Sequence, residues 1–111
     1  MPEPSTSARI VLTTAAHPEE AGRIARVLVQ EHLAACATLI PSAQSVYRWQ
    51  GEIETASETL LLIKTELEQV ATLEARLRAL HSYQTPEFLV LTVESGSEDY
   101  LSWLHGNLKD T

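Results

Sequence analysis

Apolar residues follow two different periods along the chain, one typical of strands and one typical of helices. Short runs of β-branched and aliphatic residues at 9–14, 58–64 and 88–93 predict strands. Apolar residues recur at helical spacing over 18–32, between the first two runs, and over 65–80, between the last two. Pro18 suits a first helical position, and Thr65 with Glu68 matches the capping-box pattern, so these residues are predicted to begin the two helices. A short terminal helix is predicted after Ser97, with an inner face of Leu101, Leu104 and Leu108.

The middle of the chain predicts an unusually long β-hairpin. One arm starts near Cys36 and runs to Trp49, with Pro41 at a bulge or a sheet edge because it cannot donate to the ladder. Gln50-Gly51 forms the turn, and the second arm returns over 52–64. Each arm then reaches about 40 Å, twice a typical strand. The element order β-α-β-β-α-β predicts an α+β, ferredoxin-like sandwich with a long hairpin between strands two and three and a short C-terminal helix.

The distal part of this hairpin is expected to overhang its own helices. It carries Val46, Tyr47, Trp49 and Ile53, and an isolated two-stranded ribbon with open edges is only marginally stable in water. A neighbouring subunit that covers the ribbon is therefore one interpretation. In the other, Pro41 ends the strand and the following residues form a flexible loop.

Length and charge limit the class of protein. The 111 residues favour one domain, predicted over 9–111, with residues 1–8 as a disordered tail that lacks the features of a secretory signal. No apolar run is long enough to cross a bilayer, so no membrane role is expected. The net charge of −7 argues against a nucleic-acid partner, and on charge alone a cation is the better partner. The single cysteine, Cys36, fits a reducing, cytoplasmic location.

Several separate blocks resemble the CutA family of divalent-cation tolerance proteins. They are LAACATLIP at 33–41, SVYRWQGEI at 45–53, LIKT at 62–65, HSYQTPE at 81–87 and DYLSWL at 99–104. The similarity covers residues 9 to 108. It implies a ferredoxin-like subunit in a homotrimer held by the long hairpins, and a role in tolerance of divalent metals, copper in particular. By analogy of fold, it also allows a small-molecule signalling trimer of the PII type, or a structural adaptor without a metal role.

The resemblance also implies positions for copper ligands. The family's strand-one cysteine corresponds to Thr13, and its two adjacent histidines correspond to Leu80 and His81, so His81 alone keeps a donor. His81 is the candidate metal residue because imidazole suits copper, and weak copper binding is expected. The alternative is a structural histidine that interacts with the last carbonyls of its helix.

A second group of residues resembles the lining of a cleft between subunits of the family. A lysine and a glutamate among aromatic rings can hold a small polar ligand. The alternative is a salt-bridged interface with aromatic anchors and no ligand. The group consists of Tyr47, Trp49, Lys64, Tyr83, Pro86 and Glu87.

No pattern in the sequence predicts an enzyme. There is no glycine-rich phosphate loop and no helix of a metal-dependent hydrolase. Cys36 has no base nearby in the sequence and is expected to be a buried structural thiol, although it could pair with His32 if the first helix continued that far. His17 and His105 are expected to be exposed and without partners.

Overall fold

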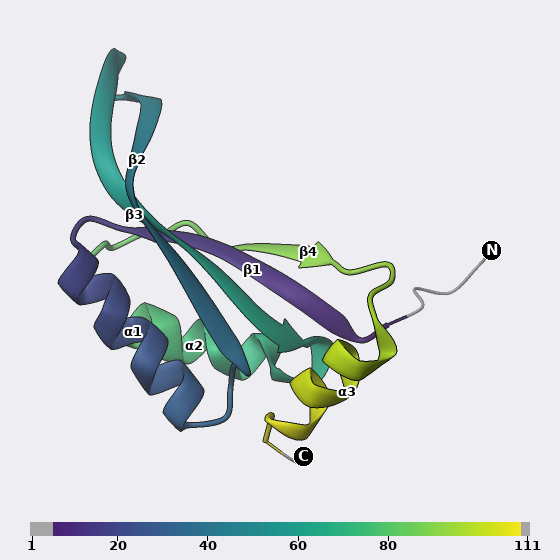
Figure 1. Ribbon diagram of the computed structural model, residues 1–111. Helices are drawn as coiled ribbons and strands as arrows, with labels where there is room; N and C mark the ends of the chain where they lie inside the picture. Colours follow the sequence, from purple (N-terminus) through teal and green to yellow (C-terminus); the bar gives the residue numbers. More distant parts are fainter. Residues whose placement is uncertain (1–5, 110–111) are drawn as a thin grey trace.

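The computed structural model describes residues 6–109 and confirms the predicted order of elements. These residues form β1 (Ala8–Ala15), α1 (Pro18–Gln30), β2 (Cys36–Trp49), β3 (Glu52–Glu66), the 3-10 turn η1 (Leu67–Gln69), α2 (Val70–Leu80), β4 (Leu89–Thr92) and α3 (Glu98–Gly106). The strands form one antiparallel sheet in the order β2-β3-β1-β4 (Figure 1). This is the strand order of the ferredoxin-like α+β fold expected from the sequence.

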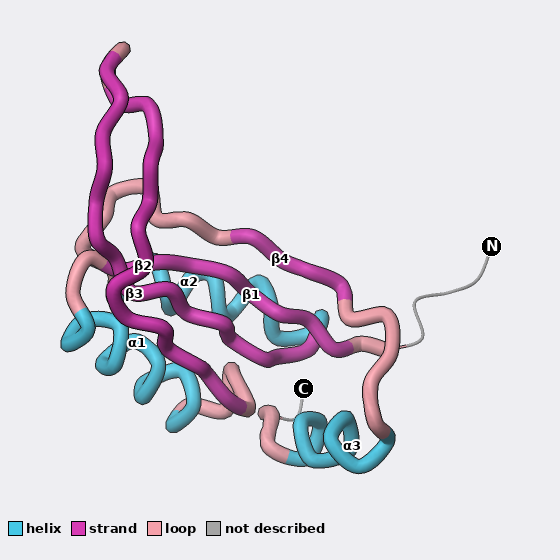
Figure 2. The backbone as a smooth tube through the Cα atoms, turned by 45° about the horizontal axis from the view of Figure 1, so that its top comes forward, coloured by secondary structure: helices cyan, strands magenta, loops and turns pink. Residues whose placement is uncertain are grey.

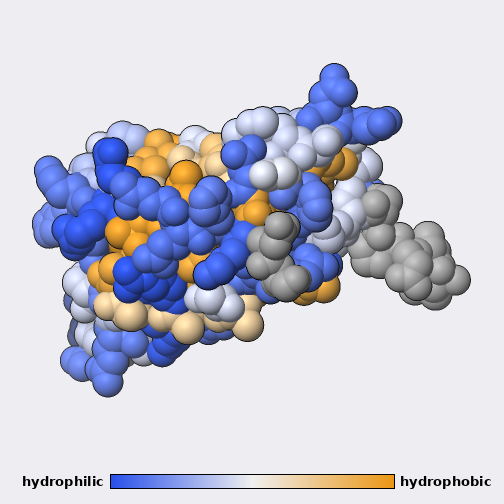
Figure 3. Space-filling model, turned by 90° about the horizontal axis from the view of Figure 1, so that it is seen from below, coloured by the Kyte–Doolittle hydropathy of each residue, from blue (hydrophilic) through white to orange (hydrophobic). Residues whose placement is uncertain are grey.

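The core lies between one face of the sheet and the helices α1 and α2. Alternate residues of the two central strands, including Val11, Leu61 and Ile63, are fully buried against Leu28 of α1 and Leu73 of α2. The outer surface of this helical layer is largely hydrophilic, with apolar side chains visible between charged ones (Figure 3). The expected amphipathic packing of the two helices is therefore present.

The long hairpin formed by β2 and β3 extends well beyond the rest of the sheet (Figure 2). A bulge interrupts its register between Ile40 and Ala43, which confirms the expected irregularity at Pro41. Gln50 and Gly51 both have positive φ, as the mirror-image two-residue hairpin turn requires. The strand therefore continues past Pro41, and the alternative of a flexible loop is wrong.

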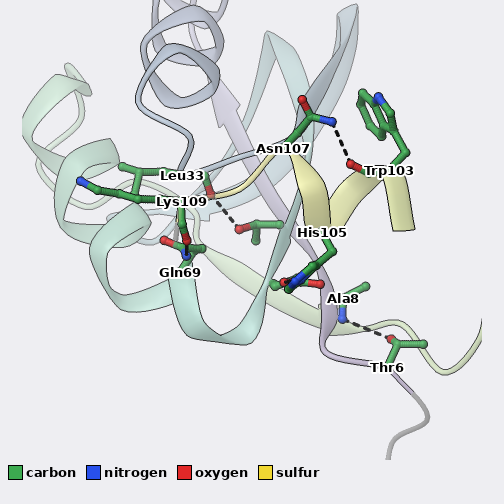
Figure 4. Close-up of polar contacts among 10 residues, drawn as sticks. Thr6, Ala8, Leu33, Gln69, Trp103, His105, Asn107 and Lys109 are labelled. Atoms are coloured by element: carbon green, nitrogen blue, oxygen red, sulfur yellow. Dashed lines mark hydrogen bonds and ion pairs between the residues drawn. The ribbon is translucent and has the colours of Figure 1, made fainter. Parts of the chain in front are cut away.

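Among residues 6–109, the opposite face of the sheet is covered at one end, by α3. Ala8 faces away from the main core and packs in a small second cluster with Ala35 and Leu104. Figure 4 shows the polar contacts that fix this end, among them the Gln69 side-chain amide donating to the Lys109 carbonyl at 2.7 Å. His105, expected to lack a partner, bonds through Nδ1 to Glu66 at 2.8 Å, so that expectation was wrong.

Two predicted helix boundaries were wrong. The first helix ends at Gln30 rather than at His32, which takes a left-handed φ of 60°. Thr65 is not a helix cap, because β1 pairs with β3 as far as Glu66 and keeps Thr65 inside the strand. Its hydroxyl donates instead to the Leu33 carbonyl at 2.7 Å. The helix α2 consequently starts at Val70, and Leu67, which lies within the range predicted as helix, belongs to η1 and is 54% exposed.

Of the predicted tail over residues 1–8, residues 1–5 lie outside the described residues. The other three contact the domain: Ala8 begins β1, and the Ser7 carbonyl accepts a hydrogen bond from the Leu67 amide at 2.9 Å. Within residues 6–109, no helix has the length and apolar character needed to span a membrane.

Candidate functional site

A hollow of about 730 Å³ lies between the projecting hairpin and the segment that joins α2 to β4. The segment that joins α2 to β4 passes beside the base of the hairpin (Figure 2). The lining includes four of the six residues that the family resemblance grouped as a cleft, and it adds others from the same segments. The lining residues are Ser45, Val46, Tyr47, Trp49, Glu58, Tyr83, Gln84, Thr85 and Glu87.

The strand register decides which hairpin side chains share a face. Beyond the bulge, Tyr47 is opposite Glu54, and Trp49 is opposite Glu52. Directly opposed residues of an antiparallel pair point to the same side of the sheet. One face of the ribbon therefore combines aromatic rings with carboxylates, while Arg48 lies on the other face.

Tyr83 links the two walls of the hollow. Its hydroxyl donates to Glu58 Oε2 at 2.8 Å, which joins the α2–β4 segment to β3. Partial burial and this hydrogen bond to a carboxylate both disfavour the phenolate, and together they raise the pKa of Tyr83 to about 12. The side chain therefore remains a neutral donor near neutral pH and holds Glu58 in place.

His81 is buried directly beside this wall, and both of its ring nitrogens are engaged. Nδ1 accepts the Tyr83 amide hydrogen at 3.0 Å, so Nε2 carries the ring hydrogen and donates to the Thr14 carbonyl at 2.7 Å. Its ring also lies 4.8 Å from that of Tyr83. The partner is thus a carbonyl of β1, not the last carbonyls of α2 as the structural alternative proposed. A metal at His81 must displace one of these two hydrogen bonds.

Glu20 of α1 completes the contacts around His81. Its Oε2 accepts the Ser82 amide hydrogen at 2.7 Å and lies 3.9 Å from His81 Nδ1. Desolvation opposes ionisation of this carboxyl, but hydrogen bonds from Ser82 outweigh it and lower the pKa of Glu20. The carboxylate therefore anchors the start of the α2–β4 segment to α1.

The other two family copper positions add no suitable donor. Thr13 is fully buried, and its hydroxyl has no hydrogen-bond partner among the described residues. Leu80 has no donor atom. Across residues 6–109, no three or more side chains of His, Cys, Asp and Glu are grouped so that they can hold a metal ion. The residues present do not fit the complete copper site of the family.

Within one chain, Lys64 and Pro86 do not line the hollow. Lys64 lies six residues along β3 from Glu58, about 20 Å away. There its Nζ donates to Thr38 Oγ1 at 2.6 Å and lies 3.8 Å from Cys36 Sγ. Pro86 is buried and is not among the lining residues. Cys36 is half-buried rather than buried, and because α1 ends before it, it does not share a helical face with His32.

Sequence reasoning missed Glu58 as a residue of this site. The signal that could have found it is the parity of the hairpin: with two residues at the bulge opposite Thr59, Glu58 falls on the face of Tyr47. Gln84 and Thr85 were missed as well, although they lie between residues that had been selected. Gln84 and Thr85 line the hollow because the hairpin lies beside them, and the sequence does not give that position.

Comparisons with known proteins agree on one family. Residues 9–107 match the family model described as CutA1 divalent ion tolerance protein. Divalent-cation tolerance protein CutA of Thermus thermophilus is 44% identical over 98 residues, which cover 88% of this chain and 95% of the relative. The crystal structure of CutA from Xylella fastidiosa superposes with a TM-score of 0.91 at 43% identity, covering 94% of this chain and 100% of the other. A structure from Archaeoglobus fulgidus, described as a periplasmic divalent cation tolerance protein CutA, gives 0.89 at 34% identity over 92% and 99% of the two chains.

Proposed function

The chain belongs to the CutA1 divalent ion tolerance family, and on that premise we propose that it acts in tolerance of divalent cations as a binding protein, not as an enzyme. The observation that carries this function is the family match over residues 9–107, which includes the hairpin and the α2–β4 segment. The hollow beside these segments, walled by aromatic and carboxylate side chains, supports a role in binding. The proposed compartment is the cytoplasm, in keeping with the free thiol of Cys36. The Archaeoglobus fulgidus neighbour is described as periplasmic, so cell fractionation is the test.

The proposed working form is a homotrimer. Two features support it, and the first is the projecting ribbon, whose Val46, Trp49 and Ile53 are each at least 60% exposed. The second is the sheet face away from α1 and α2, where Leu12 is opposite Leu89 in the register of β1 and β4. Leu89 is 55% exposed, which is unusual for a leucine in a sheet. A neighbouring subunit that covers both surfaces removes this apolar area from water.

The proposed copper binding is weak and goes through His81. In place of a thiolate, Thr13 offers only a buried hydroxyl. A hydroxyl is a poor ligand for a soft ion. Binding at His81 also breaks a buried hydrogen bond, because both nitrogens are already engaged. We therefore expect lower copper affinity than in family members that keep all three ligands.

Equilibrium titration of the full chain with Cu(II) tests this function. His81→Ala should remove most of the binding and leave the oligomeric mass unchanged, whereas His17→Ala is the matched control and should bind as the parent does. Thr13→Cys with Leu80→His restores the family ligand set and should raise the affinity. Tight binding that survives His81→Ala would mean that the site lies elsewhere, with His32 and Cys36 the next pair to replace.

A second candidate function is the binding of a small ligand in the hollow beside the hairpin. Its volume of about 730 Å³ falls within the range of small-molecule sites. Four of its lining residues, Tyr47, Trp49, Tyr83 and Glu87, also belong to the proposed cleft between subunits. In that cleft, Lys64 would come from a neighbouring subunit.

A further inference from the structure

We infer that Cys36 and Lys64 form a reversible covalent cross-link when the protein is oxidised, with a bond between Cys36 Sγ and Lys64 Nζ. This modification site lies within one subunit, so it requires neither the trimer nor a ligand in the hollow. Three properties lead to it: the strand register that places the two residues opposite each other, the contacts that hold the amine beside the sulfur, and the lack of a second cysteine in the sequence.

The pairing of β2 with β3 sets the separation of the two side chains. Cys36 is directly opposite Lys64 in this antiparallel pair. Opposed residues point to the same side of a sheet, with their Cβ atoms about 4.5–5.5 Å apart. The Ala35 amide also donates to the Lys64 carbonyl at 2.9 Å, which holds the start of β2 against β3. All these residues belong to one chain, so the geometry does not depend on a neighbouring subunit.

The amine of Lys64 lies over β2, close to the sulfur. Its Nζ donates to Thr38 Oγ1 at 2.6 Å and lies 3.8 Å from Cys36 Sγ. The lysine stem is a flexible chain of four carbons, so rotation about its bonds can bring nitrogen and sulfur to bonding distance. Two groups held this close within one molecule react far faster than the same groups free in solution.

The surroundings of Cys36 favour the lysine as its partner after oxidation. Oxidisable cysteines commonly lie beside a positive charge, and the Lys64 ammonium provides one here. Burial raises the pKa of Tyr100, and the nearby Cys36 adds to this rise, so this phenol stays neutral and adds no nucleophile. The chain has no second cysteine with which an oxidised Cys36 could form a disulfide. The amine therefore takes the place of a second thiol.

The reaction balances with one equivalent of hydrogen peroxide as the oxidant. The Cys36 thiolate attacks the peroxide, the O–O bond breaks, and the sulfur becomes a sulfenic acid while the peroxide is reduced to water. The Lys64 ammonium gives one proton to solvent, and its freed electron pair attacks the sulfur. The S–N bond forms as the S–O bond breaks, and the departing hydroxide takes a second proton from the nitrogen as water. A thiol reductant cleaves the S–N bond and restores both side chains.

The cross-link would change the charge of the proposed cleft between subunits. Lys64 is the only cationic residue in the group of six that the family resemblance places there, and the S–N bond removes its charge. Oxidation then leaves Glu87 as the only charged residue of that group. The cross-link would thereby act as a redox switch on the cleft, and this consequence alone rests on the small-ligand function proposed above.

Mass spectrometry of the full chain after treatment with hydrogen peroxide tests the cross-link. Remaining thiols are blocked with iodoacetamide, and the protein is digested without reduction. We expect an intact chain that is lighter by two hydrogen atoms, and a pair of peptides joined through Cys36 and Lys64 that separates after reduction with dithiothreitol. Lys109 is the only other lysine in the sequence, so Lys109→Arg is the matched control and should leave the yield unchanged.

Two further variants test the roles of the amine and of its position. Lys64→Arg keeps the positive charge but lacks the nucleophilic amine, so its sulfenic acid should persist. Dimedone, which labels sulfenic acids, should label this variant at least about fivefold more than the parent. Thr38→Val keeps both reacting groups but removes the hydroxyl that holds the amine, and it should lower the yield of cross-link about threefold. Circular dichroism and light scattering of every variant verify that fold and assembly are intact.

Three results would overturn the inference. Equal dimedone labelling of the parent and of Lys64→Arg would show that the amine does not capture the oxidised sulfur. An unreacted Cys36 in both proteins would show that the oxidant does not reach it. A cross-link that survives Lys64→Arg, or a disulfide between subunits, would place the partner of Cys36 elsewhere. The proposed trimer and the small-ligand function stand or fall by their own tests in each case.

Discussion

Replacing Thr13 by valine should stabilise the protein, which is unusual for a substitution in a core. Thr13 is on the buried face of β1, its exposure is 0%, and its hydroxyl has no partner among the described residues. A buried hydroxyl without a hydrogen bond costs about 1–3 kcal/mol. Valine has nearly the same shape and replaces the hydroxyl with a methyl group that is well suited to this environment. Thr13→Val should therefore raise the free energy of unfolding by about 1–2 kcal/mol.

Thr65→Val is the matched control, because the same chemical change should have the opposite effect there. Thr65 is also fully buried on the helix-facing side of the sheet, but its hydroxyl donates to the Leu33 carbonyl at 2.7 Å. Valine would leave that carbonyl unpaired and should lower the free energy of unfolding by about 1–2 kcal/mol. Urea unfolding followed by circular dichroism, at one protein concentration for all variants, measures both effects. Loss of stability in Thr13→Val would show that its hydroxyl does have a partner, and the reasoning would be refuted.

The remaining predictions concern assembly and ionisation. Light scattering should give three times the chain mass of 12.3 kDa, and a monomer would contradict the trimer. Trp49→Ala should weaken assembly by roughly 3–5 kcal/mol per chain if a neighbour buries the ring; unchanged mass and melting would show that Trp49 is peripheral. In an alkaline absorbance titration, one tyrosine should ionise only near pH 12, and Tyr83→Phe should remove that step. Because folding raises the pKa of Tyr83, the contribution of this residue to stability is complete below about pH 10 and is lost as the pH rises through about 12. Ionisation of all tyrosines near pH 10 would contradict the Tyr83–Glu58 bond.

The fold was largely predictable because periodicity and turn residues act locally. The apolar repeats of α1 and α2, the Gln50-Gly51 turn and the irregularity at Pro41 all lie where the sequence placed them. The errors lie at boundaries decided by distant contacts. Thr65 satisfies the local rule for a helix cap, but the pairing of Ala8 with Glu66 keeps the chain extended there. That pairing joins residues 58 positions apart, so no local pattern could reveal it.

The candidate site was predictable as a set of segments, but only in part as a set of contacts. The sequence predicts Tyr47, Trp49, Tyr83 and Glu87 as part of one site, and these four residues do line one hollow. Their arrangement depends on how the hairpin and the α2–β4 segment lie beside each other, which the sequence does not state. The role of His81 as a hydrogen-bonded link to the Thr14 carbonyl depends on the same tertiary packing. Its capacity to bind copper stays a prediction.

The bulge at Pro41 and Ser42 determines the side of the ribbon to which each later side chain of β2 points. Ile40 is opposite Leu60 and Ala43 is opposite Glu58, so two residues on one strand correspond to Thr59 alone on the other. Without the bulge, a ladder that continued regularly from the Ile40–Leu60 pair would place Tyr47 opposite Ile53 and Arg48 opposite Glu52, so each later side chain of β2 would lie on the other side of the ribbon. Arg48 would then replace the rings of Tyr47 and Trp49 beside the hollow. The one extra residue at the bulge therefore decides which side chains the whole projecting arm presents on the side of the carboxylates.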